Sequence, residues 1–241
     1  MTGIREPGVG PTWGERAKLP GLGPVLDPAD PTGTKNALID RLHREALGCI
    51  DRGAGRRILD FGCGTGRLSD WLREQGADVL GVDASPEMIE VARTRFPSAR
   101  FEVLESGGIS VDDGAFDTVL SVGVLQYFVM DAAELATVSL ELARVLASDG
   151  QLVCIEQVQY GELERGGTLQ AYREGFAVAG LRTTHSAVRV SSSRIISGAM
   201  RWHVVAALPG LERLVRFEAG LARPDALVDG RYADYLFVSS R

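Results

Sequence analysis

Short apolar runs of the kind that form β-strands alternate along this chain with amphipathic stretches, and this alternation restricts the fold more than any other feature. A helix between two strands returns the chain to the edge where it started, so the strands lie parallel and helices cover both faces of the sheet. We therefore expect an α/β fold with a mostly parallel, seven-stranded sheet. The predicted strands are 57–61, 78–82, 100–104, 116–121, 151–155, 181–190 and 232–239. The predicted helices are 35–52, 67–74, 86–95, 131–147 and 168–178.

Two segments fall outside this alternation. The first 31 residues hold six of the ten prolines and six glycines, a composition that disfavours regular structure. We expect a flexible arm or an extended strap over residues 1–33, followed by one domain over residues 34–241. Residues 191–231, between the last two predicted strands, are too many for a hairpin turn, so we expect a helical insertion there. Together with the arm and the helix start at Lys35 and Asn36, this insertion is expected to form a lid over the site.

Charge and composition narrow the possible partners and compartments. The chain has 26 basic and 32 acidic residues, a net charge of −6, which opposes binding to nucleic acid. No apolar run reaches the roughly 18 residues of a membrane span, and residues 1–18 lack the apolar centre of a secretion signal. Three cysteines without Cys-x-x-Cys spacing indicate neither a disulfide framework nor a metal site. We expect a cytoplasmic protein that binds no metal, membrane or nucleic acid.

The segment Ile-Leu-Asp-Phe-Gly-Cys-Gly-Thr-Gly, from Ile58 to Gly66, joins a predicted buried strand to a helix through three glycines. Glycine lets the backbone approach a ligand closely, and the first turn of the helix presents unpaired N–H groups to an anion. Asp83 ends the next predicted strand, at the position where a carboxylate binds the hydroxyls of a ribose. The pattern therefore predicts a ligand that contains a nucleoside.

The spacing of the glycines separates two classes of cofactor. A dinucleotide-binding loop has its last glycine at the sixth position, which is Arg67 in this chain. The chain has Asp60-x-Gly-x-Gly-x-Gly instead, which resembles motif I of the class I S-adenosylmethionine-dependent methyltransferases. An α/β dehydrogenase is an alternative that Arg67 disfavours.

The resemblance covers roughly residues 56–158 and implies a Rossmann-like class I methyltransferase fold with S-adenosyl-L-methionine as the cofactor. Residues 81–88 are similar to the family's second motif, in which the acid binds the ribose and the apolar residues after it flank the adenine. Residues 105–106 occupy the position of the adenine edge, with glutamate where the family usually has aspartate. Residues 121–128 resemble the segment that lies under the methionine part of the cofactor. The implied cofactor contacts are Asp60, Gly62, Cys63, Gly64, Asp83, Ala84, Met88, Glu105, Ser106, Ser121 and Gln126.

Five residues near these motifs, or with reactive side chains, also have structural interpretations. Asp60 can bond loop amides, Cys63 can fill space in the loop, and Cys154 lies in a predicted core strand. We expect His43 on the solvated surface of the first long helix and His185 packed in a strand or at its edge.

The resemblance further implies in-line transfer of a methyl group, for which the protein must position the acceptor and exclude water. A base is needed only where the attacking atom must lose a proton, and the candidate catalytic residues are Glu156, His203 and Tyr127. Glu156 can alternatively bond a loop amide. The family often has a histidine where this chain has Gln126 and Tyr127. The predicted acceptor contacts are Tyr127, Gln157, Arg201 and Trp202.

The sequence favours a small organic acceptor, methylated at nitrogen or oxygen. No Asn-Pro-Pro-Tyr or Asp-Pro-Pro-Tyr tetrapeptide is present to stack a flipped base, and Ser121 stands where metal-assisted catechol methylation requires an acid. From residue 182 onward nine arginines oppose five acids, so Arg194 or Arg201 could pair with an anionic acceptor, although a solvated helix surface explains the same charges. A non-methylating enzyme of this fold, such as a cyclase, and a non-catalytic binding subunit are the remaining alternatives.

Overall fold

The computed structural model describes residues 11–105, 108–128, 131–159, 167–190, 213 and 232–241. Within this part of the chain the strands form one seven-stranded sheet in the order β3-β2-β1-β4-β5-β7-β6. The strands are β1 (Arg57–Phe61), β2 (Asp78–Asp83), β3 (Arg100–Val103), β4 (Phe116–Val122), β5 (Leu146–Gln159), β6 (Arg182–Val190) and β7 (Tyr232–Ser240). β7 runs antiparallel to β5 and β6, and all other neighbouring strands are parallel. The predicted sheet is therefore confirmed.

The strand order creates a crevice at one place on the sheet. The chain runs outward from β1 through β2 to β3, and then returns to β4 on the other side of β1. The connections that follow β1 and β4 therefore leave the carboxyl edge of the sheet in opposite directions. Open α/β sheets bind their ligands at this reversal of strand order, outside the carboxyl ends of the strands.

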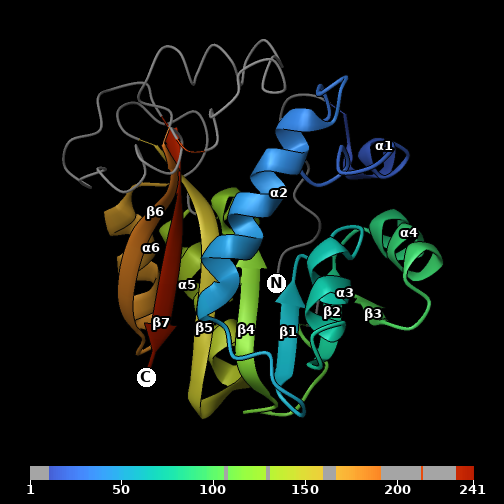
Figure 1. Cartoon of the computed structure of the whole chain (residues 1–241). Helices are drawn as coiled ribbons and strands as arrows, with labels where there is room; N and C mark the ends of the chain where they lie inside the picture. The colour runs from blue at the N-terminus through green and yellow to red at the C-terminus, as the bar shows by residue number, and fades with distance from the viewer. Residues whose placement is uncertain (1–10, 106–107, 129–130, 160–166, 191–212, 214–231) are drawn as a thin grey trace.

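Helices cover both faces of the sheet (Figure 1). α2 (Thr34–Ala46) and α3 (Arg67–Arg73) lie on one face, and α5 (Ala132–Val145) and α6 (Leu169–Val178) lie on the other. α4 (Pro86–Arg95) packs against β2 and β3. The remaining short elements are α1 (Trp13–Ala17), η1 (Leu47–Cys49) and η2 (Leu125–Tyr127). No helix in the described part of the chain has both the length and the apolar character that crossing a membrane requires.

The central strand β1 contributes to the core on both of its faces. Ile58 packs in one cluster with Leu38 of α2 and Leu72 of α3. Leu59 and Phe61 belong to the cluster on the opposite face, which the residues of α5 and α6 complete. Successive side chains of a strand point to opposite faces, so a strand covered on both sides is apolar almost throughout. This explains why β1 is apolar after its exposed first residue, Arg57, except at Asp60.

The N-terminal segment departs from the prediction. The expectation that residues 1–33 lack regular structure is wrong for residues 13–17, which form α1. Thr12 Oγ1 accepts a hydrogen bond from the N–H of Glu15, and the Glu15 carboxylate accepts one from the N–H of Thr12. This reciprocal capping box stabilises the first turn of a helix, and its Thr-x-x-Glu pattern outweighs the surrounding prolines and glycines. Residues 1–10 lie outside the described residues.

β5 is longer than the predicted strand 151–155. α5 ends at Val145, two residues before the predicted helix end, and β5 begins at Leu146, which pairs with Phe116 of β4. At its other end β5 extends to Gln159 because β7 pairs with it as far as Tyr232. Partner strands thus set the length of β5. The predicted lid over residues 191–231 lies outside the described residues, apart from Arg213.

Gly81 in β2 provides a test of how tightly this strand packs against its neighbours in β3 and α3. A Cβ at Gly81 would lie 2.7 Å from Cδ1 of Phe101 and 2.8 Å from Oγ of Ser69. We expect Gly81→Ala to lower the free energy of unfolding by about 1–3 kcal/mol, because both buried neighbours must move. Urea denaturation measures the change. Gly48→Ala is the matched control, since no described atom lies within 4 Å of its Cβ position, and a Gly81→Ala variant as stable as this control would contradict the prediction.

Candidate functional site

Glycines shape the loop between β1 and α3. Gly62 and Gly64 have φ angles of 74° and 54°, which most side chains disfavour. The N–H groups of Gly62 and Cys63 donate hydrogen bonds to the carbonyl oxygen of Val82 at 2.8 and 2.9 Å, which fastens the loop to the end of β2. A Cβ on Gly62 would lie 2.3 Å from Cγ2 of Val124. The loop therefore presents bare backbone at the carboxyl edge of the sheet.

Asp83 ends β2 beside this loop. Its Oδ2 accepts a hydrogen bond from the N–H of Gly64 at 2.8 Å, and its Oδ1 accepts one from the N–H of Ser85 at 2.9 Å. Burial raises the pKa of Asp83, and these two N–H groups oppose that effect. A carboxylate has about four acceptor positions, so Asp83 retains capacity for two further donors, such as the hydroxyls of a diol.

Asp60 lies beneath the glycine loop and supports it. Ser69 Oγ on α3 donates a hydrogen bond to Asp60 Oδ2 at 2.6 Å. Burial raises the pKa of Asp60 to about 6, against the opposing effects of Ser69 and the Arg67 guanidinium. In the described part of the chain Asp60 lines neither of the two cavities at this edge of the sheet. Its observed role is structural, because it joins β1 to α3.

A first cavity of about 120 Å³ opens at the carboxyl ends of β1, β2 and β4. Its wall is mainly apolar, with Leu104 and Phe128 among the lining residues and Asp83 as the acidic one. Glu105, predicted at the adenine edge, is exposed and does not line the cavity, and Ser106 lies outside the described residues. The predicted site residues that do line this cavity are Gly62, Gly64, Asp83, Ala84, Met88 and Tyr127.

The loop after β4 is held by one buried carboxylate. The two oxygens of Glu156 accept hydrogen bonds from the N–H groups of Val124, Leu125 and Gln126 at 3.0 to 3.1 Å, and from Ser121 Oγ at 3.3 Å. Burial raises the pKa of Glu156 to about 7, and the three N–H groups oppose that rise. The alternative interpretation of Glu156, as an acceptor for loop amides, is the arrangement observed.

The N-terminal segment lies against both loops. Trp13 and Val25 line the first cavity, and a Cβ on Gly64 would lie 2.4 Å from Cγ1 of Val25. The ring of Trp13 meets that of Tyr127 edge to face, with centroids 5.4 Å apart. Trp13 and Val25 therefore place the predicted N-terminal arm in the wall of the site.

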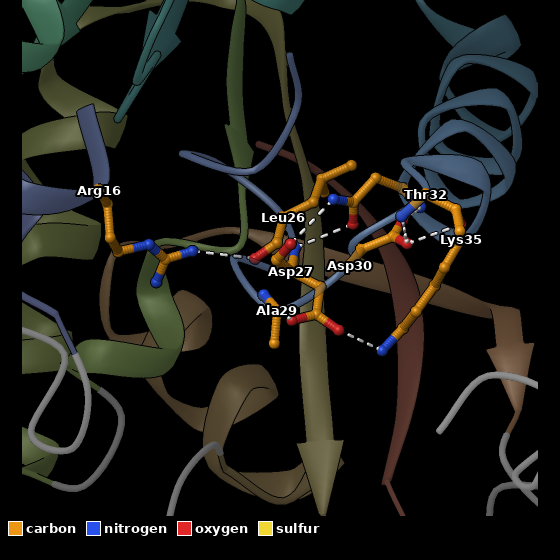
Figure 2. A network of polar contacts seen from close by, with 8 residues as sticks. Arg16, Leu26, Asp27, Ala29, Asp30, Thr32 and Lys35 are labelled. Carbon is orange, nitrogen blue, oxygen red and sulfur yellow. Dashed lines mark hydrogen bonds and ion pairs between the residues drawn. The ribbon is translucent and has the colours of Figure 1, made fainter. Parts of the chain in front are cut away.

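Side-chain hydrogen bonds fasten this segment to α2. Figure 2 shows Arg16 reaching the carbonyl oxygen of Leu26, at 2.9 Å, and Lys35 paired with the carboxylate of Asp27 at 2.5 Å. The Asn36 amide accepts from the N–H of Asp27 and donates to its carbonyl oxygen, both at 2.9 Å. The segment from Arg16 to Asp27 is thereby closed into a loop whose ends are tied to α1 and α2.

A second cavity of about 440 Å³ adjoins the first. It extends from the glutamate that holds the β4 loop to the ends of β6 and β7, and α2 and α3 contribute Ile39, His43 and Arg67 to its wall. Gln126 and Gln157 line this cavity, not the first. The residues that line both cavities are Trp13, Val25, Val122, Gly123 and Tyr127.

Three basic side chains of the second cavity, Lys35, Arg67 and Arg189, form ion pairs with aspartates. Arg189 Nε donates to Asp234 Oδ2 at 2.8 Å, and Arg67 forms an ion pair with Asp40. Burial alone would raise the pKa of Asp234, but the Arg189 guanidinium holds it well below its ordinary value. The described wall of this cavity therefore carries compensated charge.

The prediction that His43 is a solvated surface group is wrong, because His43 is only 6% exposed. It lies one helical turn after Ile39, on the side of α2 that faces the second cavity. The i, i+4 spacing to a core isoleucine is the sequence signal that indicates burial. His185 is packed as predicted, with its ring 6.0 and 6.2 Å from the rings of Tyr235 and Phe237.

Other predicted residues do not meet at the cavities. Cys63 and Ser121 are buried and line neither cavity in the described part of the chain. No group of three or more His, Cys, Asp or Glu side chains among the described residues could hold a metal ion. The predictions that fall outside the described residues are Arg194, Arg201, Trp202 and His203.

Comparison with known proteins agrees with this geometry. Residues 59–154 match the family model described as a methyltransferase domain. An uncharacterized methyltransferase of Mycobacterium tuberculosis is 38% identical over 108 residues, which are 45% of this chain and 42% of that relative. Residues 59–154 thus carry a methyltransferase domain. The chain spans about half the length, or less, of the first curated relatives it matches.

Solved structures show the same fold for this methyltransferase domain. Geranyl diphosphate C-methyltransferase from Streptomyces coelicolor, solved with geranyl diphosphate and S-adenosyl-L-homocysteine, superposes with a TM-score of 0.62 at 19% identity, over 88% of this chain and 86% of that one. The [4+2]-cyclase SpnF superposes with a TM-score of 0.57 at 18% identity, over 83% and 79% of the two chains. The predicted Rossmann-like class I fold is confirmed.

The buried Glu156 carboxylate leads to a pH-dependent prediction for the methyltransferase domain. A pKa raised from an ordinary 4.5 to about 7 means that the folded state keeps a proton that the unfolded state has lost between these values. The contribution of Glu156 to stability therefore falls as pH rises through this window, by about 3 kcal/mol in total. Urea unfolding of the wild type and of Glu156→Gln, each at about pH 5 and about pH 8, measures this change. Other acids titrate in both proteins, so the difference between their pH dependences reports Glu156. Parallel pH dependences in the two proteins would contradict it.

Proposed function

We propose that this protein is an S-adenosylmethionine-dependent methyltransferase that acts on a small organic acceptor. The observation that carries the proposal is the pair of adjoining cavities at the carboxyl edge of the sheet. One contains the glycine loop and Asp83, and the other leads away from it along β5 and β7. A group-transfer enzyme needs two such compartments side by side, because the donor and the acceptor must come into contact where the compartments meet.

The residues of the first cavity fit a nucleoside cofactor. Gly62 and Gly64 leave bare backbone in its wall, where a Cβ would collide with Val124 or Val25, which line the same cavity. Asp83 would accept hydrogen bonds from the ribose hydroxyls, while Ala84 and Met88 would lie against the adenine. S-adenosylmethionine supplies an activated methyl group on a sulfonium when it is bound. Gly123 and Val124, in the loop held by Glu156, would lie along its methionine part.

The chemistry of the protein's own residues is then mainly positioning and exclusion of water. Glu156 accepts three hydrogen bonds from the loop after β4 and one from Ser121 within β4, so its role is to hold that loop and not to remove a proton. Trp13, Val25 and Tyr127 would close the shared wall around the transferred methyl group. Tyr127 remains a candidate acceptor contact and base, and His203 and Arg201 stay predictions.

A non-methylating enzyme of the same fold is the second candidate. The structural similarity to the [4+2]-cyclase SpnF supports it, because this fold is used for chemistry other than methyl transfer. The two functions differ in their products. Incubation with S-adenosylmethionine and a panel of hydroxylated and amine acceptors gives S-adenosylhomocysteine and an acceptor heavier by one methylene if the protein is a methyltransferase. An altered acceptor without S-adenosylhomocysteine would indicate the second function.

The role of Asp83 is tested by Asp83→Asn. We expect this variant to bind S-adenosylhomocysteine roughly tenfold to a hundredfold more weakly in isothermal titration calorimetry, because the loss of charge weakens hydrogen bonds worth about 1.5–3 kcal/mol. Asp78→Asn is the matched control. It changes the same strand at its other end, where the carboxylate pairs with Arg100 on the surface. Equal affinity in the two variants would refute the ribose assignment.

A further inference from the structure

The second cavity contains a buried nitrogen without a hydrogen-bond partner. His43 Nε2 makes no hydrogen bond to any described residue, although the side chain is almost fully buried and lines the cavity. The nearest acidic atom is Asp234 Oδ2, at 3.8 Å, which is too far for a hydrogen bond. A buried polar group left unpaired costs free energy, so such a group in a cavity wall is a position for a water molecule or a polar ligand group.

Arg67 determines which ring nitrogen of His43 carries the proton. The guanidinium Nη2 of Arg67 lies 3.2 Å from His43 Nδ1. A guanidinium can only donate, so Nδ1 must accept, and the proton of the neutral ring must lie on Nε2. Burial lowers the pKa of His43, Asp234 opposes this, and the charges of Arg67 and Arg189 add to it. His43 is therefore a neutral ring that presents an N–H donor to the cavity.

Asp234 presents the complementary group. Its carboxylate is held in the ionised form by Arg189, which donates to Oδ2 at 2.8 Å. The N–H donor of His43 on α2 and the anionic acceptor of Asp234 on β7 thus lie 3.8 Å apart. A ligand group that fits between them must accept one hydrogen bond and donate another.

We propose that His43 and Asp234 bind a hydroxyl group of the acceptor, with His43 Nε2–H donating to the hydroxyl oxygen and Asp234 accepting from the hydroxyl hydrogen. This inference rests on the proposed function, because it takes the second cavity as the acceptor site. Other groups fit less well. A carboxylate would be repelled by Asp234, an ether has no hydrogen to donate, and an ammonium would leave the His43 N–H unpaired beside two arginines. Apolar neighbours such as Ile39 and Val122 suit the carbon skeleton of a small hydroxylated compound.

Nuclear magnetic resonance of the histidine side chains tests the proposal directly. The full chain, labelled with ¹⁵N in its histidines and saturated with S-adenosylhomocysteine, is titrated with phenol, anisole, benzoate and benzylamine as probes. The His43 signals are assigned by their loss in His43→Gln. We expect free His43 to show the tautomer with its proton on Nε2, and phenol to shift this nitrogen while binding at least about tenfold more tightly than the other probes.

Variants separate a specific hydrogen bond from a change in shape. His43→Leu removes the donor, whereas His43→Gln keeps an N–H donor near the position of Nε2. We expect phenol affinity to fall about tenfold in His43→Leu and to be largely retained in His43→Gln, as the loss of one hydrogen bond predicts. His185→Gln is the control, because His185 lies against α6 residues away from both cavities and should leave phenol binding unchanged.

The outcomes distinguish this inference from the proposed function. Failure of S-adenosylhomocysteine to bind would overturn the proposed function itself. If S-adenosylhomocysteine binds, the hydroxyl site is overturned by a proton on Nδ1 of free His43, by anisole, benzoate or benzylamine binding as tightly as phenol, or by phenol leaving His43 unshifted up to its solubility limit. Equal phenol affinity in His43→Leu and wild type would overturn it as well.

Discussion

Backbone N–H groups that leave the carboxyl edge of a parallel sheet have no strand partner, and in this protein carboxylates accept their hydrogen bonds. Glu156 in β5 holds three consecutive N–H groups of the loop after β4, and Asp83 at the end of β2 holds those of Gly64 and Ser85. A buried N–H left unpaired would cost about 1–3 kcal/mol, so these two acids stabilise loop conformations that have no regular secondary structure. Both loops line the first cavity, whose shape therefore depends on them.

The N-terminal segment contributes part of the wall of both cavities at this edge of the sheet. Trp13 and Val25 supply walls common to both cavities, and they are held there by hydrogen bonds from Arg16 and Asn36 to the backbone of the same segment. Side chains that pair with backbone in this way satisfy its polar groups where a proline- and glycine-rich stretch forms no regular structure. Part of the wall that the two cavities share therefore comes from a segment outside the sheet and its crossover helices.

Arg67 illustrates how one residue acquires meaning at successive levels. In the sequence it occupies the position of a glycine in dinucleotide-binding loops, and so separates two cofactor classes. In the structure it begins α3, pairs with Asp40 of α2 and donates to His43. A bulky cation after the glycine loop therefore connects the start of α3 to α2. No pattern in the sequence relates positions 43, 67 and 234, because their association depends on how α2 lies across the sheet.

The order of strands and helices, the glycine loop and the place of Asp83 could be predicted from the sequence, because each depends on residues close together in the chain: apolar periodicity, positive φ angles and the return of a crossover helix. The length of β5, the burial of His43 and the walls shared by the two cavities were decided only by tertiary structure. Each of these depends on a partner far away in the chain, and the hydrogen bonds and packing that select such a partner exist only once the sheet has formed.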